Sequence, residues 1–192
     1  MVLGLTGFSG AGKSTVAALL TEYGYYHLDC DRIVHQEVYR DPMVLAAISA
    51  AFGADTVTAD GIDRATLRKR TMGDPKALDL LNQTVMPFIR SAIEEHLDAH
   101  KDEKTILDAP LLFEYGLDRR CTYTLSVLSD RKTALARIMQ RDGIKREEAQ
   151  KRLDSQPPAS FYEERSDFVL YNDLPTHELK DRVEQIVNQI SL

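Results

Sequence analysis

The sequence predicts an α/β fold in which a parallel five-stranded sheet is flanked by helices, on three observations. Five short segments rich in apolar and β-branched residues recur along the chain. Several are continuous apolar runs, which is typical of strands buried on both faces of a parallel sheet. Helical patterns lie between these segments, and strands that alternate with helices indicate right-handed β-α-β units. A glycine-rich stretch directly follows the first apolar segment.

The expected strands and helices alternate in chain order. The strands are expected at Val2–Thr6, Tyr25–Leu28, Thr105–Leu107, Thr122–Leu128 and Asp167–Tyr171. Apolar residues at helical spacing predict helices over Lys13–Tyr23 and Arg131–Arg141, and a closing amphipathic helix from Leu179 to Ile190. Gly24 is well placed to end the first helix, because glycine readily adopts the backbone conformation of a C-terminal cap.

The stretch between the second and third strands is much longer than one crossover requires. Helical patterns occur there, among them Ala77–Leu81 and Phe88–Leu97, and we expect breaks at Pro42, Gly53, Gly61, Pro75 and Pro87. We interpret residues 33–104 as a helical insertion into a single domain that spans residues 1–192. Its core is expected at 1–32, 105–135 and 160–192, with a lid over about 136–159.

Composition and charge limit the class of protein. Of the 192 residues 43% are hydrophobic and 28% are charged, as in ordinary globular proteins. No apolar run approaches the roughly 18 residues of a membrane helix, and a nucleic-acid binder is normally basic, whereas this chain carries a net charge of −6. The two cysteines and five histidines have no metal-ligand spacing. We therefore expect a cytoplasmic protein without a membrane or nucleic-acid partner.

The glycine-rich stretch Gly7–Ser14 has the spacing G-x-x-x-x-G-K-S. Its small residues, Gly10, Ala11 and Gly12 among them, let backbone N–H groups converge on phosphate oxygens, and the helix N-terminus adds its positive dipole end. Lys13 is placed to reach the β- and γ-phosphates, and Ser14 to coordinate Mg²⁺. A glycine-rich turn that only lets a helix pack on a strand explains Gly12 but not the lysine and serine together. The stretch therefore predicts binding of a nucleoside triphosphate with Mg²⁺, with Thr15 in the same turn.

Carboxylates follow two of the expected strands. Asp29 and Asp31 are two residues apart at the end of the second strand, where an extended chain points both side chains the same way. One of them is placed to hold a substrate hydroxyl and accept its proton, or either caps a helix that begins near Arg32. Asp108, after the third strand, is expected near the water shell of the metal, or as the cap of a turn.

Positive charge concentrates between Arg131 and Arg152. Arg137 and Arg141 are four residues apart on one expected helix face, and we interpret the pair as a phosphate clamp on a closing lid. The alternative is a solvated face paired with nearby glutamates, which we favour for any single arginine of the run. We interpret the apolar cluster of Leu111, Leu112 and Phe113 as core packing, or as an apolar wall that receives the organic part of a phosphate acceptor.

Together these residues resemble the dephospho-CoA kinases, a family of P-loop kinases of small metabolites, over nearly the whole chain. The similarity runs through the segments Leu5–Ala17, Asp29–Asp31, Phe52–Gly53, Asp60–Arg64 with Leu67, Asp108–Glu114, Arg137–Asp142 and Gln156, and Ser166–Asn172. The phosphate loop is common to many families, and the segment Asp108–Glu114, similar to D-x-P-L-L-F-E, is far more specific. The chain departs from the family at Met86-Pro87, where a histidine usually precedes the proline.

The resemblance implies ATP-dependent phosphorylation of the ribose 3′-hydroxyl of dephospho-CoA, the last step of coenzyme A synthesis. It implies Asp31 as base or aligner of that hydroxyl, with Lys13 and Arg141 as charge stabilisers. Asn172 is then expected near the adenine of ATP, and the insertion is expected to hold the acceptor. Other acceptor contacts are expected from Asp29, Arg64, Asp108, Leu111 and Glu114.

Two other functions stay open at the level of sequence. One is a kinase with the same chemistry that acts on another nucleoside, nucleotide or cofactor precursor. The other is a regulatory protein that binds a nucleotide without turnover, although such a protein does not need Asp31 or Arg141. The oligomeric state is left open, with a monomer compatible with the chain length.

Overall fold

The computed structural model describes residues 1–173 and 176–190. The chain forms two compact units. Unit 1 comprises Met1–Asp29 and His100–Leu192, and unit 2 comprises Cys30–Ala99. The limits of unit 2 lie near those expected for the insertion, whereas the division into core, insertion and lid stays a prediction.

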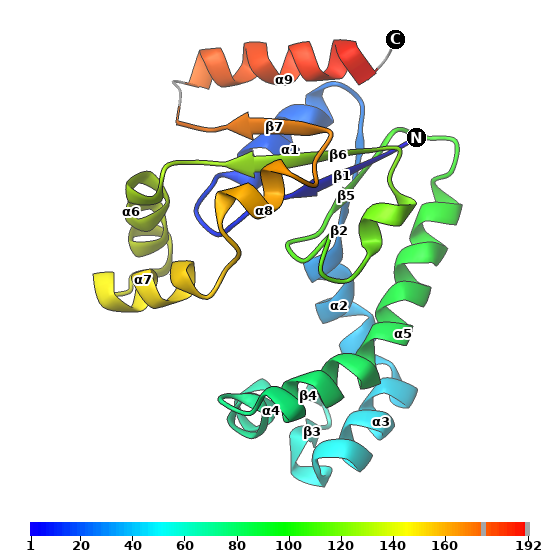
Figure 1. Ribbon diagram of the computed structural model, residues 1–192. Helices are drawn as coiled ribbons and strands as arrows, with labels where there is room; N and C mark the ends of the chain where they lie inside the picture. The colour runs from blue at the N-terminus through cyan, green and yellow to red at the C-terminus, as the bar shows by residue number, and fades with distance from the viewer. Residues whose placement is uncertain (174–175, 191–192) are drawn as a thin grey trace. The chain divides into compact units, whose positions relative to one another are not determined.

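Unit 1 contains a five-stranded sheet (Figure 1). Its strands are β1 (Val2–Thr6), β2 (Tyr26–Asp29), β5 (Thr105–Asp108), β6 (Tyr123–Leu128) and β7 (Phe168–Tyr171). They lie in the order β2-β5-β1-β6-β7, and every neighbouring pair is parallel. The predicted parallel five-stranded sheet is therefore confirmed, with each strand within one residue of its expected limits.

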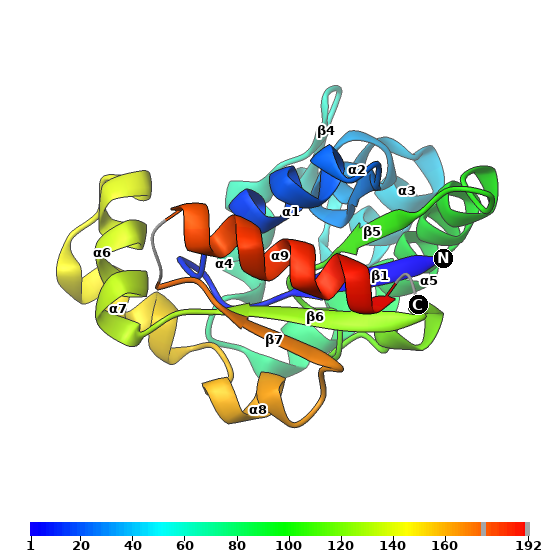
Figure 2. The same cartoon turned by 90° about the horizontal axis from the view of Figure 1, so that it is seen from above.

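Helices pack on both faces of this sheet. They are α1 (Lys13–Glu22), α6 (Arg131–Asp142), α7 (Arg146–Asp154), α8 (Ala159–Glu163) and α9 (Thr176–Ile190). Figures 1 and 2 show α1 and α8 on opposite faces, with α9 beside α1. A 3₁₀ helix, Leu117–Arg120, precedes β6. The three helices expected in this unit are all present.

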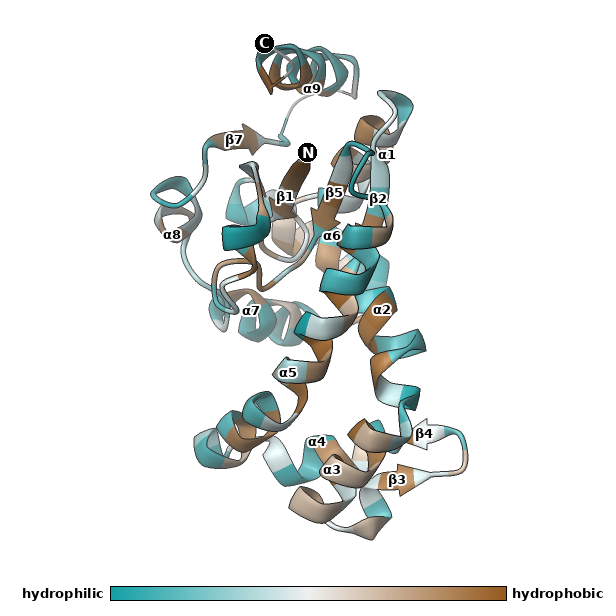
Figure 3. Ribbon diagram, turned by 90° about the vertical axis from the view of Figure 1, so that its right-hand side faces the viewer, coloured by the Kyte–Doolittle hydropathy of each residue, from teal (hydrophilic) through white to brown (hydrophobic). Residues whose placement is uncertain are grey.

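The central strands are apolar because both of their faces are covered. Leu3 and Leu5 of β1 and Leu125 and Val127 of β6 are completely buried, together with Ile106 of β5. Figure 3 shows β1 and β5 in brown and most of α7 in teal, so apolar residues concentrate in the sheet and polar ones in the outer helix. Burial on both faces explains why the strands read as continuous apolar runs.

The strand order fixes where a ligand is expected in unit 1. β2 and β5 lie on one side of β1, and β6 and β7 lie on the other. Ligands of open parallel sheets bind beyond the carboxyl ends of the strands, at the point where the strand order reverses. The connection from β1 to α1, which contains the glycine-rich stretch, leaves the sheet at that point.

Unit 2 is mainly helical. It contains α2 (Cys30–Gln36), α3 (Pro42–Phe52), α4 (Arg64–Thr71), α5 (Pro75–Ala99), the 3₁₀ helices Val38–Arg40 and Ala54–Thr56, and the short antiparallel strands β3 (Val57–Thr58) and β4 (Gly61–Ile62). α2, α3 and α4 all pack on α5. Pro42 and Pro75 begin helices and Gly53 caps the end of α3, as expected from their backbone preferences.

Two expectations about this part of the chain were wrong, and one element was not foreseen. Pro87 does not end a helix, because it lies inside α5, which Figure 1 shows bent along its length. Proline has no backbone N–H group to donate to the helix. The buried side chains Val85 and Ile89, on either side of Pro87, stabilise the helix at this point. The hairpin of β3 and β4 was not foreseen. Asp31 is not on an extended strand, because α2 already begins at Cys30.

None of the helices within the described residues is both long enough and apolar enough to cross a membrane. The longest, α5, has 25 residues, but charged residues are spread along it.

Candidate active site

The phosphate loop, Gly7–Ser14, connects β1 to α1 in unit 1. Inside it, the Ala11 N–H donates to the carbonyl of Phe8 at 3.2 Å, which closes a tight turn. The first hydrogen bonds of α1 run from Thr15 and Val16 to the carbonyl of Gly12. N–H groups before this point have no carbonyl to bond within their own helix. The loop therefore presents donors and the positive end of the helix dipole to an anion.

Three glycines of the loop, Gly7, Gly10 and Gly12, adopt backbone conformations that residues with a side chain rarely take. Gly12, at the N-terminal cap of α1, has φ of 92°, and Gly10 has φ of 81°. A Cβ at Gly12 would lie 2.0 Å from Asn172 Nδ2, and one at Gly10 would lie 2.5 Å from the carbonyl oxygen of Ala134. Both positions thus need glycine for backbone conformation and for space.

Asn172 and Arg137 hold the outer side of the loop. The buried Asn172 donates from Nδ2 to the carbonyl of Ala11 at 2.9 Å. Arg137, on α6, donates to the carbonyls of Gly10 at 3.4 Å, Ala11 at 3.3 Å and Asn172 at 2.9 Å. The loop is therefore held in shape by groups from α6 and from the end of β7.

Lys13, Asp108 and His27 form what we call the inner cluster. Lys13 Nζ pairs with Asp108 Oδ1, and His27 Nε2 lies 3.0 Å from Asp108 Oδ2. The Asp108 side chain is only 8% exposed, whereas Lys13 is 20% and His27 32% exposed. Asp108 ends β5 beside the last residues of β1, which explains why a lysine at the start of α1 reaches it.

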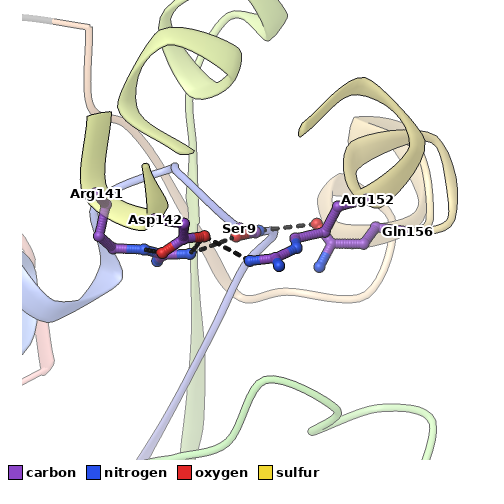
Figure 4. Close-up of polar contacts among 5 residues, drawn as sticks. All are labelled: Ser9, Arg141, Asp142, Arg152 and Gln156. Carbon is purple, nitrogen blue, oxygen red and sulfur yellow. Dashed lines mark hydrogen bonds and ion pairs between the residues drawn. The ribbon is translucent and has the colours of Figure 1, made fainter. Parts of the chain in front are cut away.

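On the other side of the loop lies the lid network, formed by Ser9, Arg141, Asp142 and Arg152 (Figure 4). Arg141 Nη2 donates to Ser9 Oγ at 3.2 Å, and its Nε donates to Asp142 Oδ1 at 2.7 Å. Arg152 also pairs with Asp142, and the Ser9 N–H donates to Gln156 Oε1 at 2.8 Å. These contacts join α6, α7 and the segment after α7 to the phosphate loop.

Arg141 and Arg152 share the Asp142 carboxylate, and these contacts shift pKa values within the lid network. The hydrogen bond to Asp142 raises the pKa of the Arg141 guanidinium. The same bond, with the nearby charges of Arg141 and Arg152, lowers the pKa of Asp142. At neutral pH the network therefore holds two cations and one anion, a net positive charge next to a loop built for an anion.

The remaining predicted residues of unit 1 differ in exposure. Ser14 and Thr15 are exposed in the first turn of α1. Leu112 is completely buried, whereas Leu111 is 42% exposed, so the apolar cluster divides between packing and surface. Glu114 is exposed. The pKa of Tyr162 is raised to about 12, first by burial of its own hydroxyl and second by the negative charge of Glu114.

The acidic pair at the end of β2 is divided between the two units. Asp29 ends β2 directly opposite Asp108 of β5 in the register of the sheet. Asp31 lies in the first turn of α2, in unit 2. Arg64 is the first residue of α4, also in unit 2, and Asp63 caps this helix through the N–H groups of the next two residues.

Four residues of the site were not expected from the sequence: His27, Ser9, Asp142 and Arg152. The five histidines were considered for metal-ligand spacing, but His27 lies two residues before Asp29 on the strand beside β5. Strand residues two apart point the same way, so the spacing of His27 and Asp29 was the signal that could have placed both side chains at one edge of the sheet. The contacts of the lid network depend on tertiary structure alone. Among the described residues, no group of three or more His, Cys, Asp or Glu side chains is arranged to hold a metal ion.

Comparison with known proteins assigns this architecture to a family. The family model described as dephospho-CoA kinase matches residues 1–178. A dephospho-CoA kinase of Latilactobacillus sakei is 35% identical over 191 residues, covering 98% of this chain and 95% of the relative. One of Chlorobaculum tepidum is 34% identical, covering 99% and 95%.

Among solved structures, a Thermus thermophilus protein superposes with a TM-score of 0.86 at 32% identity, covering 98% of this chain and 96% of its own. A shikimate kinase from Bacteroides thetaiotaomicron superposes with a TM-score of 0.59 at 14% identity, covering 100% and 99%. At that identity the second similarity concerns the fold alone, and the fold is that of P-loop kinases.

Proposed function

The chain belongs to the dephospho-CoA kinase family, and from that premise we propose which of its residues carry the reaction. The protein is a phosphotransferase that moves a phosphoryl group from ATP to a hydroxyl of dephospho-CoA in coenzyme A synthesis. Its own residues have to bind the triphosphate, position the hydroxyl and compensate the charge that moves with the phosphoryl group.

The triphosphate lies on the phosphate loop. The N–H groups of Gly12, Lys13 and Ser14 precede the first hydrogen bond of α1 and are directed to the phosphates. Lys13 contributes a cation from the inner cluster, and Arg141 contributes a second from the lid network. Arg137 and Asn172 hold the backbone of the loop through its carbonyl groups, and the family resemblance implies that Asn172 also lies near the adenine.

Mg²⁺ accompanies the ATP and shields the charge of the β- and γ-phosphates. This chain offers the exposed Ser14 hydroxyl as a direct ligand, beside Lys13 in the first turn of α1. The Asp108 carboxylate ends the neighbouring strand and would accept hydrogen bonds from water bound to the metal. The donor set, one hydroxyl and one carboxylate, consists of the hard oxygen groups that Mg²⁺ prefers.

We propose that the helical insertion holds the acceptor, as the family resemblance implies. Asp31 accepts the proton of the ribose 3′-hydroxyl or aligns that hydroxyl with the γ-phosphate. Asp29, Arg64, Asp108, Leu111 and Glu114 are its further proposed contacts. Asp31 follows the last residue of β2 by two positions, in the first turn of α2, and ligands of open parallel sheets bind beyond the carboxyl ends of the strands.

The observation that carries this assignment is the phosphate loop at the carboxyl end of β1, with Lys13 held against Asp108. The test incubates purified protein with ATP, Mg²⁺ and dephospho-CoA and follows the 3′-phosphorylated product and ADP by mass spectrometry. We expect product from the wild type and almost none from Lys13→Ala. Product formation equal to that of the Lys13→Ala control would contradict the assignment.

A second experiment addresses Asp31. Asp31→Asn is expected to bind ATP normally while kcat falls by about 10² or more, the usual cost of losing a general base. Asp98→Asn, an exposed aspartate on α5 of the same unit, is the control and is expected to keep wild-type kcat. Near-normal turnover of Asp31→Asn would remove this carboxylate from the mechanism.

We propose that the protein works in the cytoplasm on small molecules alone, without nucleic acid or membrane. The net charge of −6 supports this, because a general phosphate-backbone binder requires a basic surface. A monomer is the simplest arrangement, since all residues proposed to bind ATP come from one compact unit of one chain. Sedimentation of the purified protein measures the oligomeric state directly.

A further inference from the structure

The position of His27 in the sheet brings its imidazole ring close to Asp108. β2 is an edge strand, and it runs parallel to β5 with His27 opposite Ile106 and Asp29 opposite Asp108. Strand residues two apart point to the same face. From this position the ring reaches forward along the strand, and its Nε2 comes within 3.0 Å of Asp108 Oδ2.

The two oxygens of Asp108 are therefore held from opposite sides. Lys13 holds Oδ1 and His27 holds Oδ2. An ionised carboxylate only accepts hydrogen bonds, so Nε2 of His27 carries the hydrogen. The Asp108 side chain is 8% exposed, so water replaces neither partner easily. A carboxylate held on one side alone rotates about its last bond, because that torsion has a broad energy profile.

The lysine of the inner cluster has two anionic partners in the catalytic cycle. In this structure it pairs with Asp108, and with ATP bound it also has to reach the β- and γ-phosphates. A hydrogen bond from His27 withdraws charge from Asp108 and fixes its orientation. It thereby limits how strongly Asp108 retains Lys13, and it keeps the carboxylate in place when Lys13 turns to the phosphates.

We propose that His27 is a positioning residue for ATP binding: through its hydrogen bond to Asp108 it sets the position and the availability of Lys13. The inference rests on the proposed role of Lys13 at the triphosphate. Because His27 acts on Lys13 through Asp108, its effect is measured as the affinity for ATP in the absence of the acceptor.

The test compares three substitutions at position 27. His27→Phe and His27→Ala remove the donor, the second without adding bulk at a site that is one third exposed. His27→Gln places an amide N–H near the position of Nε2. The control is His177→Gln, at a side chain 79% exposed on α9. ATP affinity is measured by isothermal titration without acceptor, and KM for each substrate by steady-state kinetics.

We expect His27→Phe and His27→Ala to raise the dissociation constant and KM for ATP about tenfold, the scale of one hydrogen bond to a charged group. His27→Gln is expected to recover most of this loss. In an Asp108→Asn background the same substitutions at His27 are expected to have no further effect, because the partner through which they act has changed.

Unchanged ATP affinity in both donor-free variants would overturn the proposal, as would a His27→Gln variant that binds ATP as weakly as His27→Ala. An equal loss in the Asp108→Asn background would also overturn it, because His27 would then act by another route. The titration needs no acceptor. A wild type that binds ATP but makes no coenzyme A would therefore contradict the proposed function and leave the role of His27 still measurable.

Discussion

The phosphate loop has cations on two sides, and the two sides differ in how deeply their partners are buried. In the inner cluster, Lys13 pairs with a carboxylate that is 8% exposed. In the lid network, Arg141 is 59% and Asp142 22% exposed, and Arg152 is 43% exposed. Both sides bring positive charge to the same loop, from elements far apart in the sequence.

This difference in burial indicates different roles for the two sides. A buried charge that loses its partner is strongly destabilised, whereas exposed ion pairs contribute between zero and about 1 kcal/mol each and are weakened by salt. The buried Asp108 carboxylate is therefore the fixed group of the inner cluster. The lid network costs little to rearrange, so its arginines are free to exchange Asp142 and Ser9 for phosphate when the nucleotide arrives.

The largest effect is expected at the loop itself, from Gly12→Ala. The added Cβ would lie 2.0 Å from Asn172 Nδ2, and the backbone has φ of 92°. We expect ATP binding to be lost at millimolar nucleotide, because Asn172 has to leave the loop carbonyl that it holds.

Gly24→Ala is the matched control, with φ of 80° and nothing within 4 Å of the added Cβ. It carries a similar backbone strain, of order 1–2 kcal/mol, without the collision. Isothermal titration and thermal melting of both variants separate the two contributions. Equal ATP affinities in the two variants would show that the loop binds ATP even when Asn172 is displaced.

The sequence was sufficient to predict most of the sheet and the phosphate loop, because both depend on local patterns. Continuous apolar runs located β1 and β6, and the lysine and serine after Gly12 identified the loop. Pro87 was misjudged because the local cost of a proline was weighed without the packing of α5 on three other helices. Strands of two residues, as in β3 and β4, carry no periodic signal.

The same distinction explains which site residues were missed. Lys13 belongs to a motif, whereas His27 acquires its partner only from the register of β2 on β5. Ser9, Asp142 and Arg152 are brought together by tertiary contacts that span up to 132 positions of the chain. Long-range pairings of this kind are decided by the fold and cannot be inferred from spacing in one sequence.

A smaller effect is expected from Arg141→Ala in the lid network. The guanidinium contacts Ser9 of the loop, so its loss is expected to lower kcat/KM for ATP by roughly 10- to 100-fold, as for a charge-assisted contact to phosphate. The melting temperature is expected to change little, because the side chain is exposed.

Arg131→Ala is the matched control for this prediction. Arg131 lies on the same helix, is 54% exposed and also pairs with an aspartate, Asp154. We expect it to keep the wild-type kcat/KM. A large drop in melting temperature for Arg141→Ala, with activity falling only in proportion, would instead make Arg141 a structural residue of α6.

The smallest effect is expected from Asp142→Asn, and it depends on pH. The pKa of Asp142 in the folded protein lies below its ordinary value of 3.8, chiefly because of the hydrogen bond from Arg141. A carboxylate with a lowered pKa contributes stability that is fully present above the unfolded pKa and is lost as the pH falls through the folded pKa. The difference in melting temperature between wild type and Asp142→Asn is therefore expected to be constant from pH 8 to about 5 and to shrink below about pH 4.

Thermal melts across this range measure that difference, with Asp98→Asn as the exposed control.

The Asp142→Asn variant also tests the comparison between the two sides of the loop. Asp142 is the anion that holds both arginines of the lid network, so its neutralisation leaves them free to bind phosphate. We expect kcat/KM for ATP to change by less than about threefold, because exposed pairs contribute little. A loss as large as that of Arg141→Ala would mean that Asp142 positions the arginine, and that the lid network is as fixed as the inner cluster.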